Sequence, residues 1–516
     1  MVTGASALPA GGAQEAPGLR FASRAGRWVL FATVLGSGIA ALDATVVGIA
    51  LPAIGRDFHV GVSGLQWVVD AYTLTLAGLL LLGGTLGDRY GRRRVFVIGA
   101  AWFGIASLGC GLAPDITTLI VARALQGIGA ALLTPGSLAI LEASFVEQDR
   151  SRAIGAWTGL GGVATAAGPF IGGWLIGAVS WRLVFFINLP LVVAVLAIAA
   201  RHVPESRMPD VTGRLDVLGA ATVTGGLVGV TYALIEAPGS GLSSPPVLTA
   251  LVVGVALLGV FVLAETRLEV PMLPPGLFAT RQFSAANAVT FAVYGALSGA
   301  LFLLPVMLQQ VAGYSPLAAG TALLPVTVIM LTLSARSGAL AARIGPRMQM
   351  SAGPVVIAAG MALLTRVSAS GNYVTEVLPA VTVFGLGLAI TVAPLTVTAL
   401  SAVPAGQAGI ASAVNNDVAR AAGLIAVAVL PAVAGITGDS YLHPAALAHG
   451  FRVAVLISAA VCAAGGLLAA AIIRNPSRAS QDSHASRAAA EPSVPDRRLH
   501  CALDAPPLRG GDGASR

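Results

Sequence analysis

Charged side chains are scarce in this sequence, and lysine is absent altogether. Only 10% of the 516 residues are charged, and all 30 basic residues are arginines. A soluble globular chain carries about 25% charged residues. A phosphate-binding P-loop needs a lysine for the nucleotide phosphates, and a pyridoxal enzyme needs one for its Schiff base. The sequence therefore excludes both kinds of site within this chain.

Cysteine and histidine are also rare. Of the three cysteines, Cys110 and Cys462 lie in apolar runs and Cys501 lies in a polar tail, so no disulfide framework or zinc-type spacing arises. The six histidines are scattered, mostly in predicted loops, and the apolar runs contain no nucleophile–base set. We therefore expect no metal site, no catalytic residues and no cofactor, and a membrane-embedded enzyme fits this sequence poorly.

Apolar residues dominate the composition. The chain is 56% hydrophobic, with a mean hydropathy of +0.84. Apolar runs of about 20 residues, the length that a helix needs to cross a bilayer, recur from Trp28 to Ile473. Helices are expected because lipid cannot satisfy the open edge of a strand. We predict an all-α polytopic membrane protein with fourteen transmembrane helices, at 28–52, 65–86, 95–113, 117–141, 153–177, 183–200, 214–235, 246–265, 283–311, 317–335, 350–366, 376–400, 408–436 and 450–473.

The arginines gather in alternate loops. If the N-terminus lies inside, most arginines fall in inner segments, and only Arg56, Arg182, Arg366 and Arg452 lie outside. Cytoplasmic loops of membrane proteins carry such an excess. We therefore predict a protein of the cytoplasmic (inner) cell membrane with both termini in the cytoplasm. This topology explains the net charge of +7, so a nucleic-acid partner is not expected.

The two halves of the chain resemble each other. GTLGDRYGRR (84–93) recurs as GALAARIGPR (338–347), and GIGAALLTPGSLAIL (127–141) is similar to GLGLAITVAPLTVTAL (385–400). Two matches at nearly the same displacement argue against chance similarity, and a parallel internal repeat is typical of major facilitator transporters. The predicted parts are a cytoplasmic N-terminal tail (1–27), an N-terminal six-helix bundle (28–200), a linker with two extra transmembrane helices (201–282), a C-terminal six-helix bundle (283–473) and a disordered cytoplasmic tail (474–516).

Three charged residues interrupt the apolar runs at a similar depth. Asp43 lies about 22 Å from the inner edge of its span, and Asp70 and Arg123 lie about 8 Å and about 9 Å below the outer edge. A buried charge costs several kcal/mol unless it is paired or neutralised. Each aspartate therefore either pairs with Arg123 or takes up a proton. We predict that all three take part in proton coupling, and a static Asp–Arg bridge that fixes helix packing is the alternative.

The run at 408–436 contains a second acid and base. Asp417 and Arg420 stand three residues apart and share a helix face, so we predict a neutralised pair within the helix. Asn415 and Asn416 precede them and are candidates to face a water-filled cavity. The residues that we expect to line a substrate cavity are Tyr72, Gln126, Asn287, Phe291, Tyr294 and Asn415.

A charged loop, GGTLGDRYGRRR, separates the second and third spans. Gly84 and Gly91 allow close approach of the backbone. Asp88 can bond to a helix N-terminus, while Arg89 and Arg92 can grip a carboxylate. We interpret the loop as a latch that closes the inner side in one state, and plain positive-inside anchoring is the alternative.

The fifth predicted span is dense in small residues. Gly155 and Gly159 form one small-xxx-small pair and Gly168 and Gly172 form another, and such pairs let helices touch. Pro169 removes a helix hydrogen bond and favours a bend. Tight packing is one interpretation of this span, and a hinge or a sealed leak pathway is the other.

Together these segments resemble the drug:proton antiporters of the major facilitator superfamily, in the fourteen-span subfamily (DHA2-type multidrug efflux). The resemblance extends over nearly all of residues 28–473. It rests on LDATVVGIALP in the first span, GTLGDRYGRRR in the loop, LIVARALQGIGAA in the fourth span and GPFIGG in the fifth. WRLVFFINLP and LQQVAGYSPLAAG look typical of the fourteen-span branch.

The resemblance implies the major facilitator fold and export coupled to proton entry, with Asp43 as proton carrier and Arg123 modulating it. The family's inner-loop motif falls on Gly84, Asp88, Arg89, Gly91 and Arg92, and its antiporter motif falls on Gly168, Pro169, Gly172 and Gly173. The antiporter motif would mark antiport over uptake. The second-half copy of the loop departs from the pattern, because Ala342 stands where the first copy has Asp88. A latch on that side would be weaker.

The leading hypothesis is a monomeric proton-coupled antiporter that exports amphipathic small molecules or drugs across the bilayer by alternating access, driven by the proton motive force. A dedicated exporter of one antibiotic or metabolite shares this mechanism and is the first alternative. A proton-coupled uptake transporter is the second. The sequence does not name the substrate.

Overall fold

A computed structural model of the chain describes residues 18–207, 215–268, 271–404 and 407–475. The described residues up to Ile473 form one compact unit. Most of the predicted N-terminal tail and nearly all of the predicted C-terminal tail lie outside the described residues. The fold below is that of this unit.

Fourteen helical segments of the described chain are long and apolar enough to cross a membrane, which confirms the predicted all-α polytopic class. The described α-helices up to Glu265 are α1 (Arg24–Phe58), α2 (Val62–Tyr90), α3 (Arg92–Gly111), α4 (Ile116–Ser144), α5 (Glu147–Ala178), α6 (Leu183–Phe186), α7 (Asn188–His202), α8 (Val217–Ser240) and α9 (Pro245–Glu265). After a short turn, η1 (Pro275–Ala279), follow α10 (Arg281–Gln310), α11 (Pro316–Thr321), α12 (Leu324–Ile344), α13 (Pro346–Leu363), η2 (Leu364–Arg366), η3 (Tyr373–Val377), α14 (Leu378–Ser401), α15 (Ala408–Val433), η5 (Ser440–Leu442) and α16 (Pro444–Ile472).

Local sequence signals explain where several helices begin and end. Ser23 caps α1 by accepting a hydrogen bond from the Gly26 amide, and Asp115 caps α4 by accepting one from Thr118. Gly91 joins α2 to α3 with a φ of 114°, and Gly345 joins α12 to α13 with a φ of 85°. Residues other than glycine rarely adopt a positive φ. The repeated loop segments therefore place a glycine at the same kind of turn in both halves.

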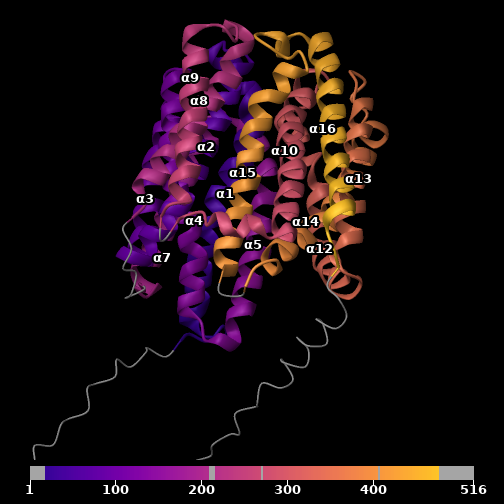
Figure 1. Ribbon diagram of the computed structural model, residues 1–516. Helices are drawn as coiled ribbons and strands as arrows, with labels where there is room; N and C mark the ends of the chain where they lie inside the picture. Colours follow the sequence, from indigo (N-terminus) through magenta and orange to yellow (C-terminus); the bar gives the residue numbers. More distant parts are fainter. Residues whose placement is uncertain (1–17, 208–214, 269–270, 405–406, 476–516) are drawn as a thin grey trace, which may run out of the picture. The chain divides into compact units, whose positions relative to one another are not determined.

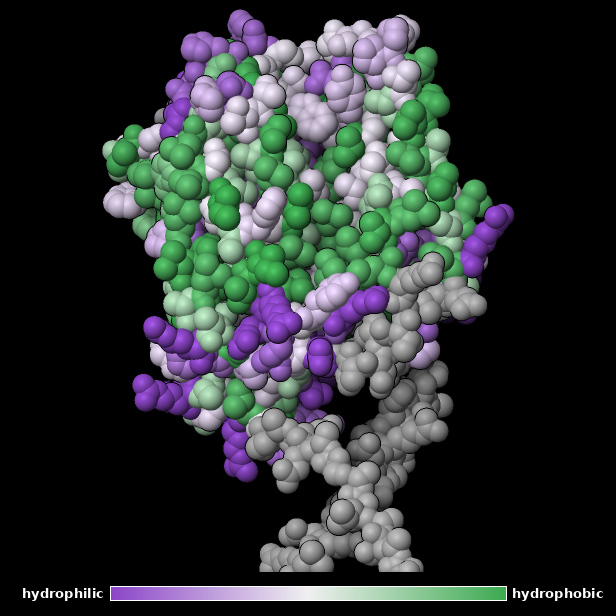
Figure 2. All heavy atoms as spheres, turned by 90° about the vertical axis from the view of Figure 1, so that its left-hand side faces the viewer, coloured by the Kyte–Doolittle hydropathy of each residue, from purple (hydrophilic) through white to green (hydrophobic). Residues whose placement is uncertain are grey.

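The surface of this unit carries an apolar belt between two polar ends (Figure 2). On the face formed by α8 and α9, large apolar side chains such as Val252, Val253, Val260 and Leu263 are exposed. Contiguous exposed apolar surface of this kind is unfavourable in water and suits lipid. The chain is a multi-pass membrane protein.

The two helices at the centre of the sequence bridge the helices on either side of them. We call α1–α7 the first half and α10–α16 the second half. Helix α8 contacts both α2 and α15 (Figure 1), and α9 packs on α8. Trp67 of α2 donates its indole N–H to Glu236 of α8 at 3.0 Å. The extra helices therefore cover one seam between the halves and leave the interior to the other helices.

The halves are joined at one end, which we call the α1–α2 turn end. One hydrophobic core there combines side chains of both halves, including Leu51 and Ile54 of α1 with Phe302 and Met307 of α10. Hydrogen bonds reinforce this contact, from Gln66 to the carbonyls of Val427 and Ala428, from Gln309 to Ile49, from Tyr441 to Val60 and from the Val62 amide to Gly438.

The opposite end, which we call the α2–α3 turn end, is built differently. Each of the larger cores there belongs to one half. One is made from residues between Val29 and Val203 in the first half, and the other from residues of α10, α13, α14 and α16 in the second half. Packing and hydrogen bonding across the halves are thus concentrated at the α1–α2 turn end. The structure is that of a two-part molecule closed at this end.

Candidate functional site

The acid of the first span, Asp43, is fully buried in α1 and paired with Arg123 of α4. Arg123 Nη1 donates to Asp43 Oδ2 at 2.5 Å, and the same nitrogen donates to Gln126 Oε1 at 2.7 Å. Both partners of the ion pair are almost completely shielded, with exposed fractions of 0% and 1%. A buried ion pair is stable only when hydrogen bonds satisfy its remaining polar atoms.

Two amides supply those hydrogen bonds. Gln126 Nε2 and Asn188 Nδ2 donate to Asp43 Oδ1 at 2.9 and 2.8 Å, and both also donate to Ser107 Oγ, at 2.7 and 2.9 Å. These four residues and Arg123 form what we call the Asp43 network. It joins α1, α3, α4 and α7, and every side chain in it is buried. The carboxylate accepts three hydrogen bonds and is fully satisfied.

Arg123 also connects this network to α2. Its Nε donates to the carbonyl of Val68 at 3.0 Å, and its guanidinium carbon lies 4.3 Å from the centre of the Tyr72 ring. A cation over an aromatic face is attracted by the ring quadrupole. Arg123 therefore holds the part of α2 that carries Asp70.

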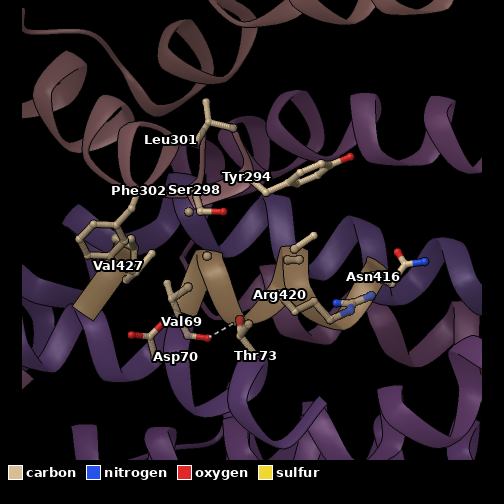
Figure 3. A pocket seen from close by; sticks show the side chains of 15 residues that line it. Val69, Asp70, Thr73, Tyr294, Ser298, Leu301, Phe302, Asn416, Arg420 and Val427 are labelled. Atoms are coloured by element: carbon tan, nitrogen blue, oxygen red, sulfur yellow. Dashed lines mark hydrogen bonds between the residues drawn. The ribbon is translucent and has the colours of Figure 1, made fainter. Parts of the chain in front are cut away.

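A cavity of about 400 Å³ lies between the two halves, next to this part of α2 (Figure 3). It is lined by Ala44, Gly48 and Leu51 of α1, by Val69, Asp70 and Thr73 of α2, by Tyr294, Ser298, Leu301 and Phe302 of α10, and by Asn416, Ala419, Arg420, Gly423 and Val427 of α15. Its apolar members Leu51, Phe302 and Val427 belong to the core that joins the halves. The cavity is therefore closed toward the α1–α2 turn end.

Asp70 is the acid of this cavity, and its carboxyl group has no partner. The residue is fully buried, and neither carboxyl oxygen has a hydrogen-bond partner. Its neighbour Thr73 donates to the Val69 carbonyl at 3.1 Å and does not compensate it. Asp43 and Asp70 are thus both buried but differ in environment, because the carboxylate of Asp43 accepts three hydrogen bonds and that of Asp70 accepts none.

The predicted ion pair between Asp417 and Arg420 does not form. The described residues show no ion pair between them, and the buried atoms Asp417 Oδ1 and Arg420 Nε have no hydrogen-bond partner. Positions three residues apart are rotated by about 60° around a helix of 3.6 residues per turn. Arg420 turns into the cavity, whereas Asp417 does not line it.

Two residues of the charged loop at the α2–α3 turn end, Asp88 and Arg92, bond within the first half. Arg92 pairs with Asp88 at 2.8 Å and donates to the Ala139 carbonyl of α4 at 3.2 Å. Arg89 lies over the ring of Tyr90, at 5.8 Å from its centre. A Cβ atom on Gly84 would lie 3.6 Å from Pro135 of α4. In this structure Asp88 therefore bonds to its own loop, not to a helix N-terminus of the other half.

The glycines of the fifth span form close helix crossings. Cβ atoms on Gly168 and Gly172 would collide with Thr45 and Val46 of α1, and one on Gly173 would collide with α11 at Pro316. Across the same crossing, a Cβ atom on Gly320 of α11 would overlap the carbonyl oxygen of Pro169. Helix α5 runs unbroken through Pro169.

The other predicted pair in this span makes no such crossing. Cβ atoms on Gly155 and Gly159 would meet nothing within 4 Å, so the prediction that these two glycines pack against a helix is wrong. They lie nearer the α2–α3 turn end, where the halves are not packed together. Close contact at the glycines of α5 is therefore restricted to the closed end.

Residues 33–428 match the Major Facilitator Superfamily. The chain belongs to this superfamily. It is 38% identical over 472 residues to the puromycin resistance protein pur8 of Streptomyces alboniger, covering 88% of this chain and 93% of that protein. It is 36% identical to the multidrug resistance protein Stp of Mycobacterium tuberculosis, covering 80% and 77%, and 34% identical to the tetracenomycin C resistance and export protein of Streptomyces glaucescens, covering 78% and 74%.

Solved structures agree on the fold of this superfamily member. A bacterial homologue of the human lysosomal transporter Spinster, in an inward-facing and unoccupied conformation, matches with a TM-score of 0.64 at 17% identity, covering 87% of this chain and 98% of that one. The nucleoside transporter NupG matches with a TM-score of 0.61 at 11% identity, covering 87% and 100%. At these identities the likeness shows the fold alone. Since the superfamily consists of transporters, the membrane-enzyme alternative is set aside.

Most of the residues expected to line the transporter's cavity lie elsewhere. Of the six, only Tyr294 lines the cavity between the halves. Tyr72 and Gln126 lie at Arg123, and Asn415 bonds to Asn287 at 3.1 Å inside the second half. Phe291 is 44% exposed and lines an apolar crevice of α10, α15 and α16. Without knowledge of how each helix is rotated, polar residues in a span indicate burial but not which space they face.

Sequence reasoning also missed residues that the site contains. Asn188 and Ser107 complete the Asp43 network, and Thr73, Ser298 and Arg420 line the cavity. Asn188 carried a usable signal, because an amide inside an apolar run needs a buried partner. Thr73 and Ser298 carried little signal, since such residues commonly bond to their own helix backbone. Among the described residues, no cluster of three or more His, Cys, Asp or Glu could hold a metal ion.

Proposed function

We propose that this protein is a proton-coupled antiporter that exports amphipathic small molecules by alternating access. The observation that carries the proposal is the unpaired, fully buried Asp70 in a cavity between the two halves. The relatives support export, because several carry resistance or export in their names. The moving parts are the six-helix bundles at 28–200 and 283–473, joined by the linker at 201–282 with its two extra helices.

The orientation that we propose places the α2–α3 turn end in the cytoplasm. Arg92, Arg93 and Arg94 gather there, as the positive-inside rule requires. Both termini then lie in the cytoplasm, and the membrane is the cytoplasmic (inner) one. The closed α1–α2 turn end faces outward, so this structure represents an inward-facing state. A monomer suffices, because the cavity is made from one chain.

We assign the exchangeable proton to Asp70. A carboxylate without a partner in a low-dielectric site is costly, and a bound proton or a cationic group removes that cost. Proton and substrate can therefore compete for the same carboxyl group, which is the simplest form of antiport. Asp43 is less suited to exchange, because Arg123, Gln126 and Asn188 already satisfy its carboxylate.

The Asp43 network has a coupling role in this proposal. Arg123 bonds to Asp43 and to the Val68 carbonyl, two residues before Asp70. Rearrangement of the ion pair would therefore move the part of α2 that carries the proton site. Asp43 and Arg123 thus remain members of the coupling machinery, with Arg123 as the link between the two acids.

The two remaining motifs govern the closed states. Gly168, Gly172 and Gly173 permit the tight crossings of α5 with α1 and α11 that close the outer side. The loop with Gly84, Asp88, Arg89, Gly91 and Arg92 is the inner latch. Its acid, Asp88, pairs here with Arg92 in the same half, as expected of an inward-facing state.

Transport into everted membrane vesicles tests this function. Puromycin is a suitable probe because a close relative is named for resistance to it. An acidic vesicle interior should drive puromycin inward, Asp70→Asn should abolish the movement, and Asp439→Asn, at an exposed site, should not. Movement of puromycin out of acid-loaded vesicles would instead identify proton-coupled uptake and overturn the proposal.

One observation favours the narrower alternative of a dedicated exporter. Relatives named for puromycin, tetracenomycin C and methylenomycin A each bear the name of a single antibiotic. Others are named multidrug resistance proteins. A panel of cationic, zwitterionic and anionic drugs in the same vesicles separates the two. Transport of one chemical type alone would favour the dedicated exporter.

A further inference from the structure

The cavity between the halves presents two opposite charges, and neither has a partner. Asp70 contributes a carboxyl group from α2 whose two oxygens accept no hydrogen bond. Arg420 contributes a guanidinium from α15 whose buried Nε donates none. Both side chains line the same space of about 400 Å³. A cavity of this size suits a small organic ligand.

The two groups do not neutralise each other. The described residues show no ion pair between Asp70 and Arg420. In Figure 3 the carboxyl group of Asp70 and the guanidinium of Arg420 lie apart from each other. Asp417 precedes Arg420 on α15, but it neither pairs with Arg420 nor lines the cavity. Each of the two residues thus lines the cavity without a counter-charge among the described residues.

Two of the other polar side chains in the lining bond to the backbone of their own helices. Thr73 donates to the Val69 carbonyl at 3.1 Å, and Asn416 donates to the Ser412 carbonyl at 3.0 Å. The end of the cavity toward the closed side is apolar, with Leu51, Phe302 and Val427. The lining thus combines two fixed charges of opposite sign with an apolar surface.

We propose that the cavity takes an amphipathic zwitterion, whose ammonium group binds Asp70 and whose carboxylate or equivalent anionic group binds Arg420. A guanidinium does not lose its proton in a protein, so only an anionic group can neutralise Arg420 fully. An ammonium group does the same for Asp70 and displaces a proton from it. The apolar part of the ligand then packs on Leu51, Phe302 and Val427. This assignment rests on the proposed function, since it names the substrate class of the same cavity.

The proposal predicts selection against amphiphiles with a single charge. A cation leaves Arg420 without a counter-charge, and an anion leaves Asp70 to a proton. A buried charge that is left without its counter-charge costs free energy, and this cost reduces the affinity for a ligand that carries only one charge. A zwitterion satisfies both groups and adds no net charge to the cavity.

Three dansyl compounds of similar shape test this at equilibrium. Nε-dansyl-lysine is a zwitterion, dansylcadaverine lacks its carboxylate, and dansyl-aminohexanoate lacks its amine. Fluorescence titration of the full-length protein in detergent at neutral pH gives a Kd for each. We expect the zwitterion to bind at least about tenfold more tightly than either single-charge compound, since charged contacts in desolvated sites commonly exceed this factor.

Two substitutions assign the two poles. Asp70→Asn should weaken binding of the zwitterion and the cation and leave the anion unchanged. Arg420→Gln should weaken binding of the zwitterion and the anion and leave the cation unchanged. Arg452→Gln and Asp439→Asn, at exposed sites, are the matched controls. The comparison of the three compounds on the unsubstituted protein keeps the test decisive if a variant does not fold.

Equal affinities for the three compounds would overturn the zwitterion assignment, and so would variants that weaken all three alike. This result is separable from failure of the antiport proposal, because binding is measured without a proton gradient. If the charge pattern is found but acid-loaded vesicles do not exchange Nε-dansyl-lysine, antiport is wrong and the binding assignment stands. If puromycin is exchanged but the pattern is absent, the assignment alone is wrong.

Discussion

Arg123 pairs with Asp43 and not with Asp70. Its Nη1 lies 2.5 Å from Asp43 Oδ2, while its Nε donates to the carbonyl of Val68, two residues before Asp70. One guanidinium thus neutralises the acid of α1 and holds the backbone beside the acid that has no partner. The two carboxyl groups, expected at one depth, are unequal in this structure.

Asp43→Asn should destabilise the protein, because Arg123 would remain charged and buried without a counter-charge. Removing one partner of a buried ion pair costs about 3–5 kcal/mol. We expect a lower midpoint of thermal unfolding in detergent, followed by tryptophan fluorescence. The double variant Asp43→Asn/Arg123→Gln should recover part of the loss, since it removes the orphaned charge as well. Additive losses in the double variant would show that the two residues do not interact.

Substrate binding should release a proton from Asp70. If an ammonium group and a proton compete for this carboxyl group, adding Nε-dansyl-lysine to the protein in weakly buffered detergent solution should acidify the solution by up to one proton per site. Asp70→Asn should bind without proton release. Asn188→Ala, which removes a donor from Asp43 Oδ1, should still release the proton. Unchanged release in Asp70→Asn would assign the exchangeable proton to another group.

The all-α polytopic membrane class of the protein was predictable because it depends on local properties that can be read directly along the sequence. Run length, charge density and arginine placement determine how many helices cross a bilayer and which ends are polar. The structure accordingly has fourteen candidate spans. The turn glycines Gly91 and Gly345 were likewise visible as parts of a repeated segment, and both adopt positive φ.

The cavity lining was not predictable in the same way, because it depends on the rotation of each helix about its axis. Asn415 and Asn416 are adjacent in sequence, yet Asn415 bonds to Asn287 inside the second half while Asn416 lines the cavity. A rotation of about 100° per residue separates them. Arg420 was assigned to a local pair with Asp417 for the same reason, since sequence spacing does not say whether a neighbouring helix draws the side chain away.

The inner loop should matter for transport more than for the stability of this state. The Asp88–Arg92 pair bridges the turn between α2 and α3 and is partly exposed, and exposed pairs contribute about 0.2–1 kcal/mol. Asp88→Asn should therefore leave the unfolding midpoint nearly unchanged. If Asp88 latches the inner side in the outward-facing state, the same variant should slow puromycin exchange severalfold in vesicles. A large fall in the midpoint with normal exchange would contradict the latch.

The glycine crossing between α5 and α11 should control closure of the α1–α2 turn end. A Cβ atom on Gly320 would overlap the Pro169 carbonyl, and carbonyl atoms of a packed helix cannot rotate away as a flexible side chain can. Gly320→Val should therefore force the two helices apart and favour a state open at this end. Gly177→Val is the matched control. Gly177 lies on α5, the partner of α11 in this crossing, and a Cβ atom at Gly177 would meet nothing within 4 Å.

Labelling of a cavity cysteine measures this opening. Ser298→Cys places a thiol in the cavity, and Cys501→Ser removes the cysteine of the tail, while the native Cys110 and Cys462 are buried. In right-side-out vesicles, a membrane-impermeant maleimide should label Ser298→Cys severalfold faster when Gly320→Val is present, and at the original rate with Gly177→Val. Puromycin exchange should fall in the Gly320→Val variant, because a transporter that cannot close its outer side cannot complete the cycle. Equal labelling rates in a folded Gly320→Val protein would show that this crossing is not what closes the outer side.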